Sequence, residues 1–357
     1  MTAPPPSASE PALLEVRDLR VHFPITRGTV FRRTVGRVHA VDGVSLELAT
    51  AETLGLVGES GSGKTTLGRA IVGLIPPTSG TILFRGLPLG AKGAASDRPA
   101  RGQLQMVFQD PMASLDPRWR VGASIAEPLR LNHIGTRAER HERVSDLLEV
   151  VGLSPAHAGR YPHELSGGQR QRVGLARALA LNPAVIVADE AVSALDVSIR
   201  AQVINLLRQL RDELKVSYLF IAHDLAVVRH LSDRVAVMYL GEIVEQAGAA
   251  DLYSDPRHPY TVSLLSAVPV PDPLVEARRE RIVLRGDPPN PASPPTGCRF
   301  HTRCWLRQRL GDPERCAVEE PAPESVSAGH TAACHFVHEV PERVRLSEVG
   351  PTSEPAS

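Results

Sequence analysis

The residues with the clearest chemical meaning form a glycine-rich segment, GESGSGKT, from Gly58 to Thr65. This order fits the pattern G-x-x-x-x-G-K-[ST], in which a curled backbone turns successive N–H groups towards phosphate oxygens. Lys64 would bring a positive charge to the β- and γ-phosphates, and the Thr65 hydroxyl would bind Mg²⁺. A glycine-rich turn that binds nothing is the alternative. The residues expected to line the phosphate site are Gly58, Ser60, Gly61, Ser62, Gly63, Lys64, Thr65 and Thr66.

Two adjacent acids, Asp189 and Glu190, follow the apolar run AVIVA at residues 184–188. An uninterrupted apolar run is typical of a strand buried on both faces in a parallel sheet, and ligands bind beyond the carboxyl ends of such strands. We therefore expect Asp189 to hold Mg²⁺ and Glu190 to orient and deprotonate an attacking water. Taken alone, two acids at a strand end are also compatible with a solvated turn.

The elements that must position these residues follow from the spacing of apolar side chains. Strands are expected at residues 14–23, 38–48, 53–57, 103–109, 184–188 and 217–222, and helices at 64–74, 138–151 and 168–181. One further helix should carry an apolar stripe made of Ile199, Val203, Leu206, Leu210 and Leu214. Strands that alternate with helices predict an α/β fold, and the mostly helical pattern over about 116–182 predicts a helical subdomain.

Composition narrows the class of protein. The chain has 357 residues, with 40 Lys and Arg against 40 Asp and Glu, so its net charge gives no general attraction to nucleic acid or anionic membranes. No apolar stretch approaches the roughly 20 residues of a membrane span, and the first residues lack the features of a signal peptide, so we expect a cytosolic protein. Residues 1–11 should form a disordered tail, and residues 27–37 a basic surface insertion.

Residues Leu165 to Gln169 read LSGGQ, and here the sequence resembles the ATP-binding-cassette (ABC) ATPases. The resemblance implies a P-loop NTPase cassette with a mixed sheet core and a helical subdomain. It also implies that ATP is clasped between two cassettes, with one chain supplying the signature residues to the nucleotide of the other. A simple helix N-cap is the alternative explanation of Ser-Gly-Gly. The signature positions expected at the nucleotide are Ser166, Gly167, Gly168 and Gln169.

Other positions match this family in the expected order. Gln109 resembles the glutamine that contacts Mg²⁺ or water, residues 193–196 resemble the loop that crosses the dimer with Asp196, and His223 resembles the histidine at the γ-phosphate. A lone histidine at a strand end is otherwise usually structural. Ala191 and Val192 stand where many cassettes carry a proline, a departure that should leave catalysis in place.

The aromatic residue that stacks on adenine is harder to locate, because the insertion after Ile25 blurs the spacing. We assign it to Phe23. His22 and Phe31 are the competitors.

A proline-rich composition begins after Gly248, so a boundary is expected between 250 and 270. The segments from His258 and from Gly297 resemble the C-terminal extension of the oligopeptide/dipeptide importers, and with the cassette the resemblance covers about residues 13–338. The extension contains all four cysteines, Cys298, Cys304, Cys316 and Cys334. A reducing cytosol disfavours disulfides, and four thiolates suit zinc or an iron–sulfur cluster. The resemblance favours a [4Fe–4S] cluster over zinc; unliganded thiols, or His301 and His335 as substitute ligands, are the alternatives.

These observations predict an ABC ATPase domain at 12–255, an importer-type extension at 256–340 and a disordered tail at 341–357. The expected function is that of the ATPase subunit of an importer for peptides or related small solutes. It would pair with a second cassette and two membrane permeases on the cytoplasmic face of the membrane, indirectly serve a solute-binding protein, and bind no nucleic acid. A soluble ABC ATPase acting on nucleic acid or the ribosome is the alternative. A metal-binding module with a vestigial nucleotide fold is a third reading, which intact Lys64, Asp189 and Glu190 oppose.

Overall fold

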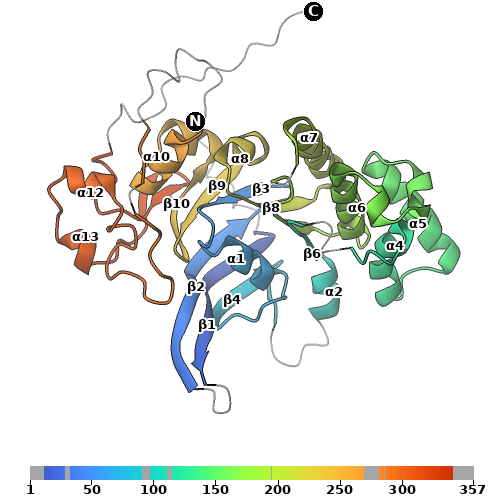
Figure 1. Cartoon of the computed structure of the whole chain (residues 1–357), viewed down its shortest axis with the longest axis horizontal. Coiled ribbons are helices and arrows are strands. Elements are labelled where there is room, and N and C mark those ends of the chain that lie inside the picture. The colour runs from blue at the N-terminus through green and yellow to red at the C-terminus, as the bar shows by residue number, and fades with distance from the viewer. Residues whose placement is uncertain are drawn as a thin grey trace, which may run out of the picture. The chain divides into compact units, whose positions relative to one another are not determined.

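The computed structural model describes residues 12–28, 33–90, 97–110, 115–193, 195–268, 281–284 and 286–340 (Figure 1). The chain forms two compact units. The first takes in Gly43–Thr53, Leu67–Ile221 and the described start of the chain up to Leu19; the second takes in Arg20–Asp42, Leu54–Thr66 and the described residues from Ala222 onwards. The expected tails and Phe31 lie outside the described residues. The division expected at residues 255 and 256 stays a prediction.

The first unit contains three neighbouring parallel strands that are largely buried: β6 (Leu104–Val107), β7 (Val185–Asp189) and β8 (Ser217–Ala222). In the register, Val187 lies between Met106 and Leu219. Every residue of β7 and β8 is buried, as expected for apolar strands covered on both faces. This burial fixes the end of β7, and therefore the position of the acids that follow it.

A second, four-stranded sheet has the order β2-β1-β4-β5, built from β1 (Leu14–Arg27), β2 (Arg33–Leu48), β4 (Ser79–Phe84) and β5 (Leu87–Pro88). The first two strands are longer than the sequence pattern predicts. Their added residues are mostly exposed, so no apolar alternation marks them. The expected basic insertion is therefore the end of a hairpin, as far as its residues are described.

The described residues between β6 and β7 form helices and turns and no strand. They include α4 (Val121–Leu131), α5 (Arg137–Val150), α6 (Gly167–Leu179) and the short 3₁₀ turns at Pro155–Gly159 and Pro162–Glu164, and α4, α5 and α6 pack together (Figure 1). A capping box at Thr136 and Glu139 starts α5. The long helix α7 (Val197–Leu214) buries most of the expected stripe, but Leu214, in its last turn, is 49% exposed.

In the second unit, β3 (Thr53–Val57) pairs in parallel with β9 (Arg234–Tyr239), which forms an antiparallel hairpin with β10 (Glu242–Gly248). Two short strands of the C-terminal region continue this mixed sheet in the order β10-β12-β11, namely β12 (His330–Ala332) and β11 (Glu324–Ser327). The sequence did not predict them, because β11 is polar and mostly exposed.

The helices of the second unit are short. They are α8 (Leu225–Leu231), α9 (Ala249–Ser254), α10 (Pro259–Ser266), α12 (Trp305–Arg309) and α13 (Arg315–Val318). Helix α1 (Lys64–Ile71) starts in the second unit and continues into the first. Helix α2 (Asp97–Gly102) belongs to the first unit. Tyr239, Tyr260 and Phe300 form an aromatic core with ring centroids 4.7 to 5.4 Å apart. Within the described part of the chain, no helix has the length and apolar character needed to cross a membrane.

Candidate functional site

The glycine-rich loop leaves β3 and enters α1 at Lys64, so strand, loop and helix follow in the order that the motif requires. Lys64 Nζ donates hydrogen bonds of 2.7 Å to the carbonyl oxygens of Gly58 and Glu59 and lies 3.3 Å from Ser62 Oγ. Gly63 has a φ of +106°, and a Cβ there would lie 2.0 Å from the carbonyl oxygen of Ala40. Only glycine fits this position, and the ammonium group lies inside the curl of the loop.

The other predicted loop residues line the rim of this curl. Ser60 and Gly61 are exposed, while Thr65 and Thr66 are half-buried in the first turn of α1. The backbone is closed by a bond of 3.2 Å from the N–H of Ser62 to the carbonyl oxygen of Glu59. The loop and Lys64 therefore form one site; the phosphate and Mg²⁺ roles of its residues stay predictions.

Glu59, inside the loop, has contacts that the sequence did not indicate. Its backbone N–H donates to Tyr260 Oη at 2.8 Å, and its carboxylate accepts from both terminal nitrogens of Arg303, at 2.8 and 3.1 Å. The Arg303 side chain is 6% exposed. A two-point ion pair of this kind fixes orientation as well as charge.

In the first unit, Gln109 and Glu190 lie in contact. Gln109 Nε2 donates to Glu190 Oε2 at 2.8 Å. The backbone of Glu190 is held at both ends, because its N–H donates to the carbonyl oxygen of Ile221 at 2.9 Å and its own carbonyl accepts from Ser193 Oγ at 2.9 Å. Asp189, the last residue of β7, is 2% exposed. The structure thus fixes the carboxylate of the predicted base beside the predicted glutamine.

The signature residues start α6 as a capping box. Gln169 N–H donates to Ser166 Oγ at 3.3 Å, and Ser166 N–H donates to Gln169 Oε1 at 3.0 Å. Helix geometry gives the N–H groups of Gly167 and Gly168 no acceptor inside the helix. The capping alternative is therefore correct for two side chains, and it leaves two backbone donors at a helix N-terminus that favours anions.

The remaining cassette positions lie at element ends. Asp196 is exposed at the start of α7, without a capping bond from its side chain. His223 is exposed between β8 and α8, and the adjacent Asp224 caps α8 by accepting from Ala226 N–H at 2.8 Å. His223 belongs to the same unit as the glycine-rich loop, whereas Gln109 and Glu190 belong to the other unit.

The four cysteines line one pocket in the C-terminal region, together with residues that include His301 and His335. All four are free thiols. Burial raises the pKa of Cys298 and Cys334 to about 12 and that of Cys304 to about 11, so these groups become thiolates only beside a compensating cation. His301 Nδ1 and His335 Nε2 are bonded to backbone carbonyl oxygens at 2.8 and 2.9 Å, and a histidine held in this way can still bind a metal through its other ring nitrogen.

The spacing of these sulfurs differs from that of a zinc site. A tetrahedral zinc with Zn–S bonds of about 2.3 Å places its sulfurs about 3.8 Å apart. Among the described residues, which include all four cysteines, no three of these sulfurs lie within 4.8 Å of one another. The sulfurs as placed therefore do not form a tetrahedral zinc site.

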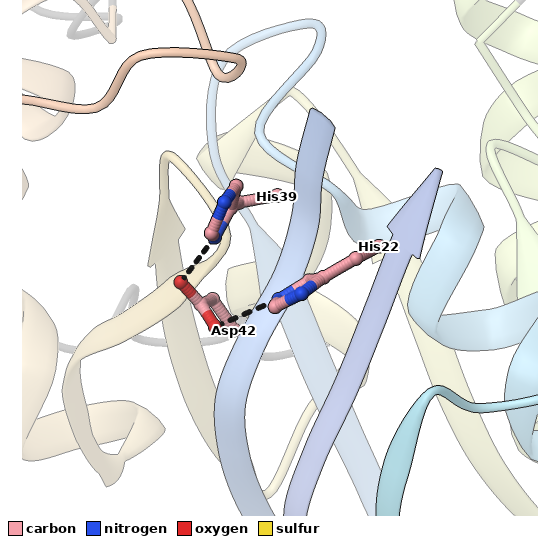
Figure 2. A group of neighbouring side chains, drawn as sticks. All are labelled: His22, His39 and Asp42. Carbon is pink, nitrogen blue, oxygen red and sulfur yellow. Dashed lines mark hydrogen bonds and ion pairs between the residues drawn. The ribbon is translucent and has the colours of Figure 1, made fainter. Parts of the chain in front are cut away.

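A group of three side chains, His22, His39 and Asp42, has the composition of a metal site (Figure 2). Asp42 accepts from His22 Nε2 at 2.9 Å and His39 Nδ1 at 3.0 Å, and the figure shows both rings pointing at this carboxylate. Arg299 Nη2 also donates to it at 2.6 Å. Since a guanidinium already compensates Asp42, we interpret the cluster as a hydrogen-bonded network. The network holds the ring of His22. Phe23, the other described candidate for stacking on adenine, is 39% exposed.

Comparison with known proteins identifies the family of this chain. The family model described as "ABC transporter" matches residues 41–193, and the model described as "Oligopeptide/dipeptide transporter, C-terminal region" matches residues 244–309. The oligopeptide transport ATP-binding protein AppF of Bacillus subtilis is 52% identical over 331 residues, which cover 92% of this chain and 99% of AppF. The chain belongs to the ABC transporter family.

A second relative of this ABC protein, the oligopeptide transport ATP-binding protein OppF of Salmonella typhimurium, is 51% identical over 324 residues, 90% of this chain and 95% of OppF. Among solved structures, cbiO1 of Clostridium perfringens, part of the ABC transporter complex cbiONQ, matches with a TM-score of 0.59 and 26% identity over 69% of this chain and 92% of its own. The ATP-binding cassette MJ0796, in a dimeric post-hydrolysis state bound to ADP and Pi, matches with a TM-score of 0.57 and 26% identity over 66% of this chain and 98% of its own. The prediction of an α/β P-loop NTPase cassette is confirmed.

The contacts of Glu59, Arg303 and Arg299 are the part of the site that the sequence did not predict. Each joins residues more than 200 positions apart, Glu59 with Arg303 and Asp42 with Arg299. The one sequence signal is the alternation of arginines with cysteines in CRFHTRC, residues 298–304. This pattern does not indicate which residues the two arginines contact.

Proposed function

We propose that this ABC protein is the ATP-hydrolysing subunit of an importer for oligopeptides, dipeptides or related small solutes. Its relatives AppF and OppF carry the name oligopeptide transport ATP-binding protein and match over nearly their full length. The C-terminal region matches the model described for oligopeptide/dipeptide transporters. As an ABC ATPase, the chain binds and hydrolyses ATP, and the proposal adds what that hydrolysis drives.

The hydrogen bond from Gln109 to Glu190 is the observation that carries the catalytic part. It fixes one oxygen of the Glu190 carboxylate beside the amide of Gln109. In the proposed reaction a water molecule gives a proton to Glu190 while the oxygen of the water bonds to the γ-phosphorus. The bond between the γ-phosphorus and the β,γ-bridging oxygen breaks, and the products are ADP and phosphate. His223 would contact the γ-phosphate.

Phosphate binding is assigned to the loop at Gly58–Thr65 and to Lys64, whose ammonium already lies among loop carbonyl oxygens. Mg²⁺ would be held by the hydroxyl of Thr65, the amide of Gln109 and the carboxylate of Asp189, an all-oxygen set of the kind this ion prefers. Bound Mg²⁺ would neutralise charge on the β- and γ-phosphates. Phe23 would stack on the adenine, a role supported by its exposure and by the commitment of His22 to Asp42.

The signature residues Ser166 to Gln169 and Asp196 would act on the nucleotide of a second ABC subunit, identical or different. The helix N-terminus left by the capping box supports this role, and the related cassette MJ0796 is described as dimeric with ADP and Pi. Two membrane permeases, and through them a solute-binding protein, are the further partners that we propose, with the complex at the cytoplasmic face of the membrane. Nucleic acid is not among these partners.

For the cysteine pocket we propose a [4Fe–4S] cluster held by Cys298, Cys304, Cys316 and Cys334. The four thiols are the donor set of such a cluster, and they line one pocket. When bound, the cluster would add a redox-active group to this region. Cys304 Sγ and Cys334 Sγ also accept backbone N–H groups at 3.4 Å, bonds that favour the thiolate form.

Replacement of Glu190 by Gln tests the catalytic proposal. We expect ATP turnover to fall by a factor on the order of 10²–10⁴ while ATP still binds, because the amide keeps the shape but accepts no proton. The exposed Glu149 on α5, replaced in the same way, is the matched control and should keep full activity. Unchanged turnover in the Glu190→Gln variant would exclude it as the base.

Co-purification tests the transport assignment. An importer subunit should be recovered with two polytopic membrane proteins after mild solubilisation. Recovery with ribosomes or RNA, together with ATP hydrolysis stimulated by RNA, would instead favour a soluble ABC ATPase.

A further inference from the structure

The segment between the first two cysteines, residues 298–304, carries two arginines that both reach the nucleotide-binding end of the second unit. We name this segment, Cys298 to Cys304, the arginine bridge. We propose that the arginine bridge positions the phosphate loop, so that the state of the cysteine pocket sets the affinity for ATP. The inference rests on the proposed ATPase function and adds a positioning role for Arg303, together with regulation of the same site.

The first connection runs from Arg303 to Glu59. The guanidinium donates to both carboxylate oxygens, at 2.8 and 3.1 Å, and a further bond of 3.4 Å reaches Tyr239 Oη. The Arg303 side chain is only 6% exposed, so the pair is less weakened by water than a surface ion pair. A shift of Arg303 therefore moves Glu59 or leaves a buried guanidinium without its counter-charge.

Two backbone groups of Glu59, its carbonyl oxygen and its N–H, are also held by hydrogen bonds. Its carbonyl oxygen accepts from Lys64 Nζ at 2.7 Å, and its N–H donates to the hydroxyl of Tyr260 at 2.8 Å. A displacement of the Glu59 side chain is thus transmitted to Lys64, the residue that meets the phosphates. Tyr260 packs against Phe300 with ring centroids 5.4 Å apart, and Phe300 is part of the arginine bridge.

The second connection runs through Arg299 and the turn between β9 and β10. Arg299 Nη1 donates to the carbonyl oxygen of Leu240 at 2.7 Å, and the N–H of the next residue, Gly241, donates to the carbonyl oxygen of Ser62 at 2.9 Å. Arg299 also pairs with Asp42 at 2.6 Å and with Glu242 at 2.7 Å. The arginine bridge therefore reaches the loop at Glu59 and at Ser62.

The cysteine pocket fixes both ends of the arginine bridge. Cys298 and Cys304 line the pocket, and the N–H of Cys298 donates to the carbonyl oxygen of Cys316 at 3.0 Å. Any change in what the thiols hold alters the ends of a segment of seven residues, Cys298 to Cys304, whose middle holds the phosphate loop. The pocket and the loop are thus joined by packed side chains and not only by sequence.

The test is the ATP dissociation constant of the full chain, measured by titration calorimetry, with KM and kcat from steady-state hydrolysis. Arg303→Ala and Glu59→Gln should each raise the dissociation constant about 5- to 50-fold, within the usual range of coupling between sites. The double variant should bind ATP no more weakly than the single variant with the larger dissociation constant, because the two substitutions remove the same contact. KM should rise with the dissociation constant while kcat changes less, and Arg303→Lys should recover only part, because lysine cannot make the two-point pair.

Arg309→Ala is the matched control, because Arg309 is exposed on α12 in the same region. It should bind ATP like the parent chain. Coupling to the pocket is measured with Cys334→Ser, which lies outside the arginine bridge: we expect weaker ATP binding in the parent chain and no further weakening in the Glu59→Gln background.

The outcomes separate the two proposals. A parent chain that binds no ATP would refute the proposed function and this inference with it. A parent chain that binds ATP, with Arg303→Ala or Glu59→Gln equal to Arg309→Ala, would refute the inference alone, and so would additive effects of Cys334→Ser and Glu59→Gln. If the Arg303→Ala variant does not fold, the Glu59→Gln variant decides the question. This variant should fold, because the Glu59 side chain is 27% exposed and glutamine has the same shape as glutamate.

Discussion

Alanine replacements of two glycines in α6, Gly168 and Gly174, should have clearly different effects on stability. A Cβ at Gly168 would lie 2.5 Å from Ile199 Cγ2, whereas a Cβ at Gly174 would have no atom within 4 Å. Carbon atoms in contact prefer about 3.5–4.0 Å, so the first replacement overlaps Ile199 by about 1 Å. Overpacking of this kind costs about 1–3 kcal/mol.

Both replacements also gain helix propensity, about 1 kcal/mol for alanine over glycine. This gain is common to the pair and cancels in their difference, so Gly174→Ala should be more stable than Gly168→Ala by about 1–3 kcal/mol. The measurement is urea unfolding of the full chain followed by circular dichroism, with midpoints compared at equal slope because a chain of two compact units need not unfold in one step.

Ile199→Ala provides the internal check. It removes Cγ2, so the loss caused by Gly168→Ala should largely disappear in the Ile199→Ala background, giving an interaction free energy of about 1–3 kcal/mol. If the two glycine variants differ by less than about 0.5 kcal/mol, the packing explanation of Gly168 is wrong. If the double variant regains stability but not ATP hydrolysis, Gly168 has a second role at the nucleotide.

Three further predictions concern other described residues. Glu245 is fully buried and accepts from His330 Nε2 at 2.8 Å and from two backbone N–H groups, so Glu245→Ala should lower the free energy of unfolding by about 3–5 kcal/mol in urea titrations, while the exposed Glu324→Ala should change it by less than about 0.5 kcal/mol. Phe23→Ala should weaken ATP binding about 5- to 100-fold by calorimetry and Phe23→Tyr should not, if the ring stacks on adenine; equal affinities would exclude the assignment. Burial raises the pKa of Glu242 to about 7, so between about pH 4.5 and 7 the folded chain holds one proton more than the unfolded chain. The free energy of unfolding therefore falls as the pH rises through this window, and Glu242→Gln should flatten that part of the plot of stability against pH.

Sequence reasoning located the buried elements well because burial on both faces leaves an uninterrupted apolar run. The strands predicted at 184–188 and 217–222 are β7 and β8 within a residue or so at each end. The helix predicted at 168–181 is α6, for the related reason that its buried face repeats at helical spacing. These elements place Asp189, Glu190 and the signature, so most of the candidate nucleotide site could be predicted.

The unpredicted elements lack that signal. The exposed ends of β1 and β2 and the polar strand β11 are held by pairing with neighbouring strands, and backbone pairing leaves little trace in side-chain type. The contact of Arg303 with Glu59 has the same character, since an arginine can meet any acid that the fold brings near it. Such contacts depend on the complete tertiary structure and could not be read from spacing.

The two helix ends that we propose as phosphate-binding are built differently, and the difference accounts for the pairing of two cassettes in our proposal. At α1 the loop encloses an ammonium group, Lys64, that can neutralise phosphate. At α6 the first turn has no acidic residue to repel an anion, but the guanidinium of Arg170 donates to the carbonyl oxygen of Pro162 at 2.9 Å, so the end offers mainly backbone N–H groups and the helix dipole. A helix dipole contributes about 0.3–1 kcal/mol for each charge near it, too little to hold a triphosphate alone. The α6 end can therefore add to a phosphate that a Lys64-type loop already neutralises, and in the proposed dimer that loop belongs to the second subunit.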